Sequence, residues 1–534
     1  MKSHTELEWQ FATADLAPAR AWLASQPTES SSRRLAAGAP LEILDTYYDS
    51  SDWMIYRAGF ALRLRQSANA DAANAGGFEV TLKSLHAASS GFARRTEISG
   101  KVASADMTRV LAAEDAIAAR IRELVGTRAL AALFQVRTHR EPLRLLEADS
   151  DLPLAEVALD DTAIDTPAGA AQQFTRVEVE CINAEPAALD SWVEDFRAGA
   201  QLQAVQLSKF RAGLAAAGLD PEKRLTLGSL EISPRQDFPA TQRAQLRRYL
   251  GMVLDAEPRV RVGTADSVHE MRVAARHLDV LLRSWQRRGP DWAVRERRTV
   301  RLLVRSLGAV RDRDVQIAHL DSSLAAPGDD EQHALRPMLD RLRNERSALR
   351  GRLLTVLDSE RVRFWVQGWQ EKLREEPVAA AGLAEPTGAI ARELIREQAR
   401  KLRKRARKIG AESGPDDFHE VRIRAKRLRY TLDAFAALYG EAAHIYTRAL
   451  GRLQDILGAF HDAAVREQHF VALANDAQPL PSSTYFAMGR LVERDRRAFE
   501  RCRRKFPKAY SRVRGRRWRA LADAMRSHSP PETS

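Results

Sequence analysis

Polar and hydrophobic residues alternate in short segments through roughly the first 180 residues of the chain. In residues 6–11, Glu6, Glu8 and Gln10 fall on one face of an extended strand, and three hydrophobic residues fall on the other. The same period of two predicts strands at residues 61–65, 79–83, 95–97, 155–160 and 177–180. Helical spacing occurs at residues 105–124 and 187–200. These patterns predict an α+β unit built on an antiparallel sheet.

The polar faces of these strands carry pairs of like charges, such as Arg63 with Arg65 and Glu178 with Glu180. For any one strand, the simplest interpretation is a solvated face of an antiparallel sheet. Like charges on one face repel unless a group of opposite sign lies between them. Carboxylate pairs attract divalent cations, and Arg or Lys pairs attract phosphate oxygens. A sheet closed into a barrel with both kinds of pair in its lumen would suit a metal-phosphate substrate.

Several motifs in residues 1–215 occur in the order typical of one family, the CYTH superfamily of triphosphate tunnel metalloenzymes. The motifs are Glu6-x-Glu8-x-Gln10, Tyr47-Tyr48-Asp49, Leu62-Arg63-Leu64-Arg65, Thr81-Leu82-Lys83, Arg95-x-Glu97, Glu156, Glu178-x-Glu180 and Ser208-Lys209. The resemblance implies an eight-stranded antiparallel tunnel that hydrolyses a triphosphate with Mg²⁺ or Mn²⁺, using a water of the metal as nucleophile.

The same resemblance implies roles for individual residues of the tunnel. The metal ligands would be Glu6, Glu8, Glu178 and Glu180, and Glu156 is a further acidic candidate. The phosphate contacts would be Arg63, Arg65, Lys83, Arg95, Arg140 and Lys209. Glu6, Glu8 and Lys83 form the predicted catalytic group, and the general base is either a tunnel carboxylate or Lys83.

Two positions depart from the family pattern. Gln10 stands where the opening Glu-x-Glu-x-Lys signature has lysine, and Arg176 stands where many relatives place a third glutamate. Glutamine can donate a hydrogen bond to a phosphate oxygen but brings no charge. Losing a charge-assisted contact of about 1.5–3 kcal/mol predicts a roughly ten- to hundredfold weaker hold on that oxygen. We therefore expect that catalysis in the tunnel is slower, acts on another substrate, or has been lost.

From residue 242 onward the pattern changes to long helical periodicity, and the sequence is duplicated. Residues 269–273 (HEMRV) recur as residues 419–423 (HEVRI), and residues 307–312 (LGAVRD) recur as residues 457–462 (LGAFHD). Both matches have the same offset, 150 residues, which indicates a tandem repeat. Each copy keeps a Leu-Gly pair, which we interpret as a turn, followed by Asp312 or Asp462.

A basic stripe accompanies each copy of the repeat. His269, Arg272 and Arg276 fall on one stripe of a helix, and His419, Arg422 and Lys426 fall on the equivalent stripe. The second copy concentrates Arg and Lys where an ordinary solvated helix would mix signs. The alternatives are a solubilising surface or a generic RNA-binding one. Because the duplication keeps the basic residues, we favour a receptor for an anion, in which the aspartates either orient arginines or end helices.

Residues 240–525 resemble the CHAD domain, an all-α domain of two four-helix repeats. The resemblance implies binding of long-chain inorganic polyphosphate along a basic groove, and an association with polyphosphate granules. The predicted polyphosphate-binding residues are His269, Arg272, Arg276, Arg311, His419, Arg422, Lys426, Arg427 and Arg429. Aromatic residues suited to base stacking are sparse near these stripes, so nucleic acid is the weaker alternative.

Composition adds an asymmetry of charge between the two halves. Within the net charge of +13, residues 1–220 hold 22 Lys and Arg against 30 Asp and Glu, and the remainder holds 62 against 41. The basic half should attract polyanions. Two cysteines suit a reducing compartment. Without a signal-peptide core or a long apolar run, we predict a cytoplasmic protein that does not enter a membrane.

The sequence therefore predicts a tunnel domain at residues 1–215, a linker at 216–239, a helical domain at 240–525 and a disordered tail at 526–534. The predicted function is metal-dependent hydrolysis of inorganic triphosphate, or a related triphosphate, coupled to polyphosphate binding. One alternative is a non-catalytic polyphosphate-binding protein with a degenerate tunnel. Another is thiamine triphosphate hydrolysis or nucleotide cyclisation, the latter without a visible adenine-recognising feature.

Overall fold

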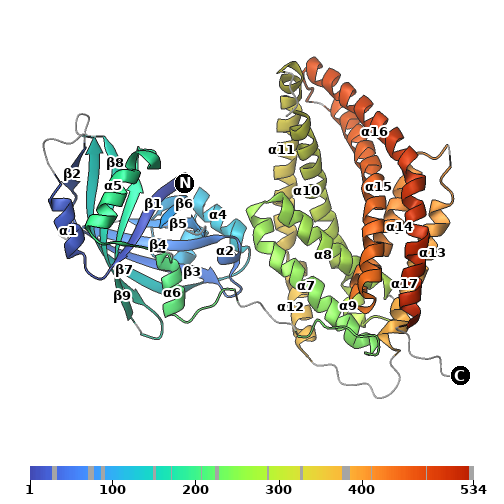
Figure 1. The fold of residues 1–534 in the computed structure, drawn as a ribbon, viewed down its shortest axis with the longest axis horizontal. Helices are drawn as coiled ribbons and strands as arrows, with labels where there is room; N and C mark the ends of the chain where they lie inside the picture. The colour runs from blue at the N-terminus through green and yellow to red at the C-terminus, as the bar shows by residue number, and fades with distance from the viewer. Residues whose placement is uncertain are drawn as a thin grey trace. The chain divides into compact units, whose positions relative to one another are not determined.

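The structure is a computed structural model that describes residues 1–26, 33–69, 77–85, 91–147, 152–169, 171–205, 207–222, 228–285, 288–324, 329–375, 385–410, 412–476 and 478–527. The chain divides into two compact units, Met1–Arg224 and Leu225–Ser534, each with its own core (Figure 1). The linker predicted at residues 216–239 brackets this division. Arg526 and Ser527 end a helix, contrary to the predicted tail, and residues 528–534 lie outside the described residues.

The first unit is an eight-stranded antiparallel barrel with two short strands added at its rim. The barrel strands are β1 (Lys2–Thr13), β3 (Leu41–Ser50), β4 (Phe60–Asn69), β5 (Phe78–Ser84), β6 (Phe92–Val102), β7 (Leu130–Glu147), β8 (Pro153–Asp165) and β9 (Ala171–Cys181). They follow the order β1-β6-β5-β4-β3-β7-β8-β9, and the β1–β9 pairing closes the ring. β2 (Arg33–Ala37) pairs with β7, and β10 (Gln203–Ala204) pairs with β1. The predicted barrel is confirmed.

The period-two pattern sorts side chains between the lumen and the outside of the barrel. On β1, Glu6, Glu8 and Gln10 face inward, while Trp9 and Phe11 join a core on the outer surface. Two helices, α1 (Ala17–Ala24) and α5 (Pro186–Gly199), cover this core (Figure 1). The predicted helix at 105–124 is two helices, α3 (Met107–Ala112) and α4 (Ala116–Val125), because Asp115 caps a new start by accepting from Ala118 N–H.

A short helix, α6 (Lys209–Ala216), packs against one end of the lumen. Phe210 lies with Tyr47 and Phe134 in an aromatic cluster whose ring centroids are 5.0–6.0 Å apart. A Cβ at Gly213 would overlap the Phe134 ring, so glycine permits this close approach. The helix thereby places Lys209, at its first turn, inside the barrel. The 4-residue helix α2 (Met54–Arg57) lies nearby, held by Asp49, which accepts from Ile55 and Tyr56 N–H.

The second unit is all-helical and contains two related sets of four helices. The first set is α7 (Phe238–Val262), α8 (Ala265–Ser284), α10 (Arg297–Leu324) and α11 (Asp329–Leu357), and the second is α13 (Thr387–Ala406), α14 (Pro415–Ala434), α15 (Gly440–Ala474) and α16 (Ser482–Arg514). α8 and α14 begin and end at the same 150-residue offset as the sequence repeat. The remaining helices are α9 (Asp291–Arg295), α12 (Glu360–Arg374), η1 (Ala436–Leu438) and α17 (Arg516–Ser527). The prediction of two helical repeats is confirmed.

Two apolar clusters hold the helical unit together. A large core contains α7, α8, α13 and α14, with Trp285 and Trp369 among its fully buried side chains. A separate cluster joins α10 and α11 to α15 and α16 at their far ends (Figure 1). The predicted Leu-Gly turn is wrong, because Gly308 lies inside α10 and Gly458 inside α15. At Gly308, α10 lies beside the Arg272 side chain: a Cβ added to this glycine would be 3.7 Å from Arg272 Nε.

Candidate functional site

The lumen of the barrel contains charged side chains of both signs that pair with one another. Arg65 makes a bidentate pair with Asp45, with both N···O distances 2.8 Å. Arg63 lies 3.6 Å from Asp45 and 3.5 Å from Glu97. Asp45 is 1% exposed, and although burial opposes ionisation, Arg65 and Arg63 lower its pKa to about 2. The strands β3, β4 and β6 thus hold two arginines in place before any ligand arrives.

A second group surrounds Lys83 on β5. Its ammonium contacts Glu6, lies 3.4 Å from Glu8 and lies 3.7 Å from Glu97. Arg95 donates to Glu8 at 2.7 Å. Burial would lower the pKa of Lys83, but the three carboxylates raise it above the ordinary value. Lys83 is therefore a fixed cation at neutral pH, which favours a tunnel carboxylate over Lys83 as the general base.

A third group joins β7, β8, β9 and α6. Arg140 forms a bidentate pair with Asp160 at 2.8 and 2.7 Å and also donates to Glu178 at 2.6 Å. Lys209 contacts Asp160 and lies 3.1 Å from Glu178. Burial would raise the pKa of Glu178, but Lys209 and Arg140 hold it well below the ordinary value. Glu178 therefore belongs with the basic residues, whereas the sequence placed it among the metal carboxylates.

The remaining carboxylates form a row across three strands. Glu8 on β1 lies opposite Glu180 on β9, and Glu180 lies opposite Glu156 on β8. Burial raises the pKa of Glu180 to about 7, with Glu6 and Glu8 contributing repulsion. Burial also raises the pKa of Glu8. Carboxylates that repel one another in a low-dielectric lumen are the donors a divalent cation prefers, so Glu6, Glu8 and Glu180 fit such an ion chemically.

In the structure as it stands, Lys83 pairs with Glu6 and Glu8, and Arg95 pairs with Glu8. Among the residues that the structure describes, no three His, Cys, Asp or Glu are arranged to hold a metal ion. A cation at Glu6 and Glu8 would therefore replace Lys83 as their counter-charge and leave Lys83 available to phosphate.

Gln10, at the lysine position of the signature, lies buried in the same lumen. Its side-chain amide donates to Glu8 at 3.0 Å, and on the neighbouring strand it lies opposite Glu178. The amide thus satisfies an acceptor but adds no positive charge. Arg176, the other departure, is buried over the Phe174 ring at 4.7 Å, and burial lowers its pKa.

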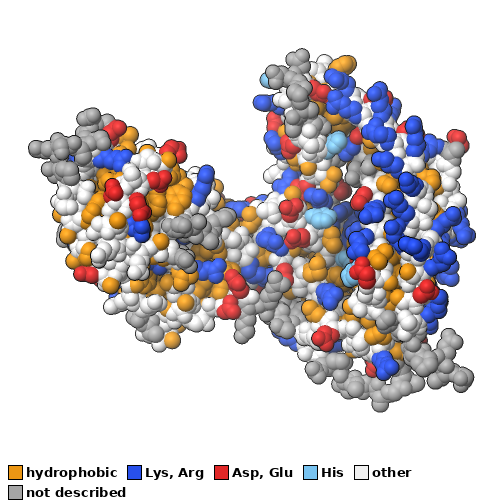
Figure 2. Space-filling view, viewed as in Figure 1, with side chains coloured by type: hydrophobic (Ala, Val, Ile, Leu, Met, Phe, Trp, Pro, Cys, Tyr) orange, Lys and Arg blue, Asp and Glu red, His pale blue; other side chains and the backbone are white. Residues whose placement is uncertain are grey.

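In the helical unit, the structure brings the two basic stripes together. α8 and α14 pack against each other, and the charge of Arg422 contributes to lowering the pKa of Arg272. Burial is the main cause of that shift, followed by Arg276, and the pKa of Arg272 falls to about 10. Repulsion among arginines in a partly buried place is the condition that an anion relieves. Figure 2 shows Lys, Arg and His side chains gathered in a hollow on this face of the helical unit.

Further charged residues lie beside these stripes. Asp312 lies 3.8 Å from Arg272, inside α10 rather than at a helix end, which supports its orienting role. Arg311 is one of the charges that lower the pKa of His269, after burial. Arg422 and Lys426 likewise lower the pKa of His419, after burial. Arg429 lies 3.8 Å from Asp433. We use "basic groove" for His269, Arg272, Arg276, Arg311, His419, Arg422, Lys426 and Arg429.

Arg427 does not share this face, contrary to the sequence prediction. Together with Arg424 it lines a different cavity, beside Arg283 of α8. Burial lowers its pKa, followed by repulsion from Arg283 and Arg424. Its counterpart in the first repeat, His277, is stacked on Tyr249 at 4.4 Å and buried, which lowers the pKa of His277 to about 3. The side chains of residues 459–462, with His461 and Asp462, lie outside the described part of the chain.

The sequence-based prediction did not include Asp45 and Asp160, the two most buried acids of the lumen. Each forms ion pairs with two of the predicted phosphate-binding cations. A signal was available, because Asp45 directly follows Ile43 and Leu44 in a strand, and a buried charge there requires a partner.

Comparison with known proteins divides the chain at the same place. A family model described as the CYTH domain matches residues 24–212, and one described as the CHAD domain matches residues 244–471. An uncharacterised protein of Mycobacterium tuberculosis (strain ATCC 25618 / H37Rv) is 26% identical over 506 residues, which cover 89% of this chain and 90% of the relative.

Solved structures resemble each half separately. The CHAD domain of the plant Ricinus communis is 21% identical and covers 57% of this chain and 96% of its own, with a TM-score of 0.40. HpAC1 from Hippeastrum, described as an adenylyl cyclase candidate with a dominant triphosphatase activity, is 18% identical and covers 40% of this chain and 97% of its own, with a TM-score of 0.30. Within the described residues, no helix has the length and apolar character needed to span a membrane.

Proposed function

We propose that this chain, which joins a CYTH domain to a CHAD domain, hydrolyses a phosphoanhydride of inorganic triphosphate in its barrel and binds long-chain polyphosphate through its helical unit. The observation that carries the proposal is the arrangement of the lumen. Six cations from four strands and α6 converge there with a row of acids in which the pKa values of Glu8 and Glu180 are raised.

In this proposal, the basic residues of the lumen bind phosphate and the acidic residues bind the metal ion. Arg63, Arg65 and Arg140, fixed by Asp45 and Asp160, would hold phosphoryl oxygens without reorganising during the reaction. Mg²⁺ or Mn²⁺, held by Glu6, Glu8 and Glu180, would neutralise phosphate charge and polarise the bond to be cleaved. Lys83, released from those carboxylates, would stabilise charge that develops on the terminal phosphate.

Phosphate release from tripolyphosphate, ATP and thiamine triphosphate, each with Mg²⁺ and with Mn²⁺, tests the proposal. Metal-dependent release from tripolyphosphate at the highest kcat/KM is expected. Release from thiamine triphosphate alone would show that the barrel hydrolyses this compound instead of inorganic triphosphate. If none of the three is hydrolysed, the protein is the non-catalytic alternative, a polyphosphate-binding protein whose tunnel has lost its activity.

The raised pKa of Glu180 predicts a pH dependence for metal binding. A carboxylate binds a cation only after it loses its proton, and this proton is held up to about pH 7 rather than the ordinary 4.5. The concentration of Mn²⁺ for half-maximal activity should therefore rise as the pH falls from about 8 to 6. In Glu180→Gln this dependence should flatten over the same range, with weaker metal binding throughout. A wild-type Mn²⁺ requirement that stays constant between pH 6 and 8 would contradict the assignment of Glu180.

Gln10→Lys tests the departure from the family signature. The new ammonium would replace an amide that now lies 3.0 Å from Glu8. A charge-assisted contact exceeds a neutral one by about 1–2 kcal/mol, so the KM for tripolyphosphate should fall about tenfold. Gln10→Met, which removes the hydrogen bond without adding charge, is the matched control and should not lower KM. If Gln10→Lys changes neither kcat nor KM, position 10 does not contact substrate.

A further inference from the structure

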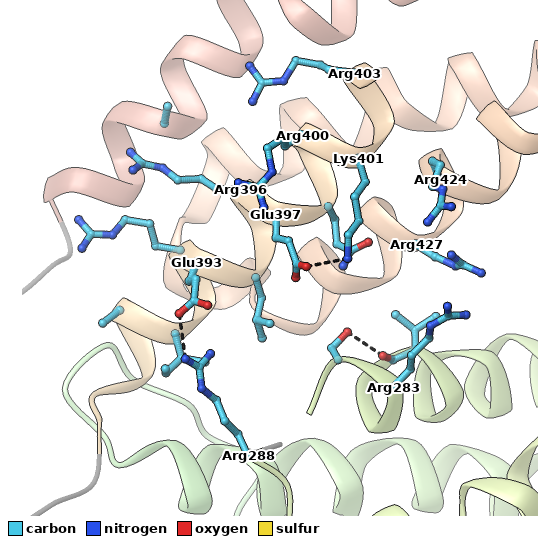
Figure 3. Close-up of a pocket in the computed structure, with 18 of the residues that line it drawn as sticks. Arg283, Arg288, Glu393, Arg396, Glu397, Arg400, Lys401, Arg403, Arg424 and Arg427 are labelled. Carbon is cyan, nitrogen blue, oxygen red and sulfur yellow. Dashed lines mark hydrogen bonds and ion pairs between the residues drawn. The ribbon is translucent and has the colours of Figure 1, made fainter. Parts of the chain in front are cut away.

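A large cavity lies in the helical unit apart from the basic groove, and we call it the arginine cavity. It has a volume of about 1440 Å³ and is lined by parts of α8, α13, α14 and α17. Ten basic and four acidic side chains line it. Figure 3 shows Arg424 and Arg427 on α14 and a row of arginines on α13 around the same space. Arg422 and Lys426, which belong to the basic groove, are not among its lining residues.

The four acids of the cavity neutralise only part of its positive charge. Glu397 accepts from Lys401 at 2.6 Å, and Glu393 from Arg288 at 3.1 Å (Figure 3). Asp279 accepts from Arg297, outside the cavity, at 2.9 Å. The negative charge of Glu385 also raises the pKa of Arg288. Within the cavity the acids therefore pair with Arg288 and Lys401, and the other arginines of the lining have no such pair among the described residues.

Arg403 lies over the Trp518 ring, and six other arginines of the lining remain without a carboxylate partner among the described residues: Arg283, Arg392, Arg396, Arg400, Arg424 and Arg427. On α13 they follow one helix face at intervals of four residues, where like charges destabilise a helix. Arg424 and Arg427 approach from a second helix and Arg283 from a third. Burial lowers the pKa of Arg427, and Arg283 and Arg424 lower it further. A solvated basic surface would place such residues apart, on a convex face.

From this concave, unneutralised cluster we infer that the arginine cavity is a second anion site, for a compact polyanion with several phosphate groups. Guanidinium groups bind phosphate oxygens in bidentate fashion, and six of them match several phosphates rather than one. The phosphates could belong to a free compact compound or to part of a long polyphosphate chain. This inference does not depend on hydrolysis in the barrel, and it concerns residues on the opposite face of α14 from the basic groove.

Arginine modification by phenylglyoxal, measured residue by residue with mass spectrometry, tests the site in the full-length protein. Tripolyphosphate and long-chain polyphosphate are the two probes, used without divalent cations. At about ten times the dissociation constant, modification of Arg396 and Arg400 should slow about tenfold. Arg501 and Arg504, exposed on α16, are the internal controls and should react at an unchanged rate.

The double variant Arg272→Gln/Arg422→Gln separates the cavity from the groove. If tripolyphosphate still protects Arg396 and Arg400 in this variant, the cavity is a site for a free compact polyanion. If only long-chain polyphosphate does so, the site holds part of a chain. Protection that disappears with the groove variant, or protection that neither probe gives, overturns the inference, as does equal protection of Arg501 and Arg504.

Discussion

Glu8→Gln should reduce metal-dependent phosphate release from tripolyphosphate by about 100-fold or more. In our proposal, the Glu8 carboxylate both binds the metal ion and holds Arg95 in place. It is 2% exposed, and it accepts from Arg95 and Gln10. It also lies opposite Glu180, in the row of acids that fits a divalent cation. The amide keeps the size of the side chain but removes the charge that a cation requires. Initial rates at saturating Mg²⁺ and Mn²⁺ measure the effect, and Glu6→Gln should behave alike.

A matched control separates loss of chemistry from loss of folding. Glu114→Gln makes the same substitution at an exposed position between α3 and α4, and it should retain full activity. Both glutamine variants of the lumen should retain wild-type affinity for long-chain polyphosphate, since that binding is assigned to the other unit. Activity in Glu8→Gln within about threefold of the wild type would exclude Glu8 from the metal site, a threefold change being under about 1 kcal/mol of barrier.

Arg272→Gln/Arg422→Gln should weaken binding of long-chain polyphosphate by about 100-fold or more. Each arginine contributes a charge-assisted contact of about 1.5–3 kcal/mol when it holds a phosphate. The two arginines lie on α8 and α14, which pack together, and the charge of Arg422 contributes to lowering the pKa of Arg272. Affinity of the wild type should also fall steeply between about 50 and 200 mM salt, because phosphate binding releases counterions. The slope of log Kd against log salt should be shallower in the double variant.

Arg516→Gln/Arg517→Gln is the charge-matched comparison, at the start of α17 and outside the basic groove. Because surface charges are screened at physiological salt, we expect a loss below about threefold. Equal losses from the two double variants would mean that affinity follows net charge alone. Tighter binding of RNA than of polyphosphate at matched phosphate concentration would contradict the receptor function in a different way.

Local patterns in the sequence were sufficient for much of the fold. The period of two in residues 6–11 predicted which side of β1 faces the lumen, since side chains of a strand alternate regardless of its neighbours. The 150-residue repeat predicted two equivalent helices, and α8 and α14 have that offset. β7, the longest strand with 18 residues, was not predicted. Its pattern is less regular, because its apolar residues change faces along the strand: Phe134 and Val136 pack with Tyr47 and α6, whereas Leu143 and Leu145 pack on the outer core.

Only the tertiary structure decided which charges are partners. Sequence spacing placed Glu178 and Glu180 together on one face, but Glu178 meets Arg140 and Lys209 from other elements, while Glu180 meets acids. The two pKa values therefore move in opposite directions, an effect of neighbours that are distant in the chain.

The same division holds for the helical unit. The sequence alone determined that a duplicated basic helix exists, because the repeat and the charge are both visible in the order of the residues. Only packing decided that Arg422 lies near enough for its charge to lower the pKa of Arg272, whereas Arg427, five residues later, lines a separate cavity with Arg283. On a helix, positions five residues apart point in different directions, so which neighbour each meets depends on the helices packed around it.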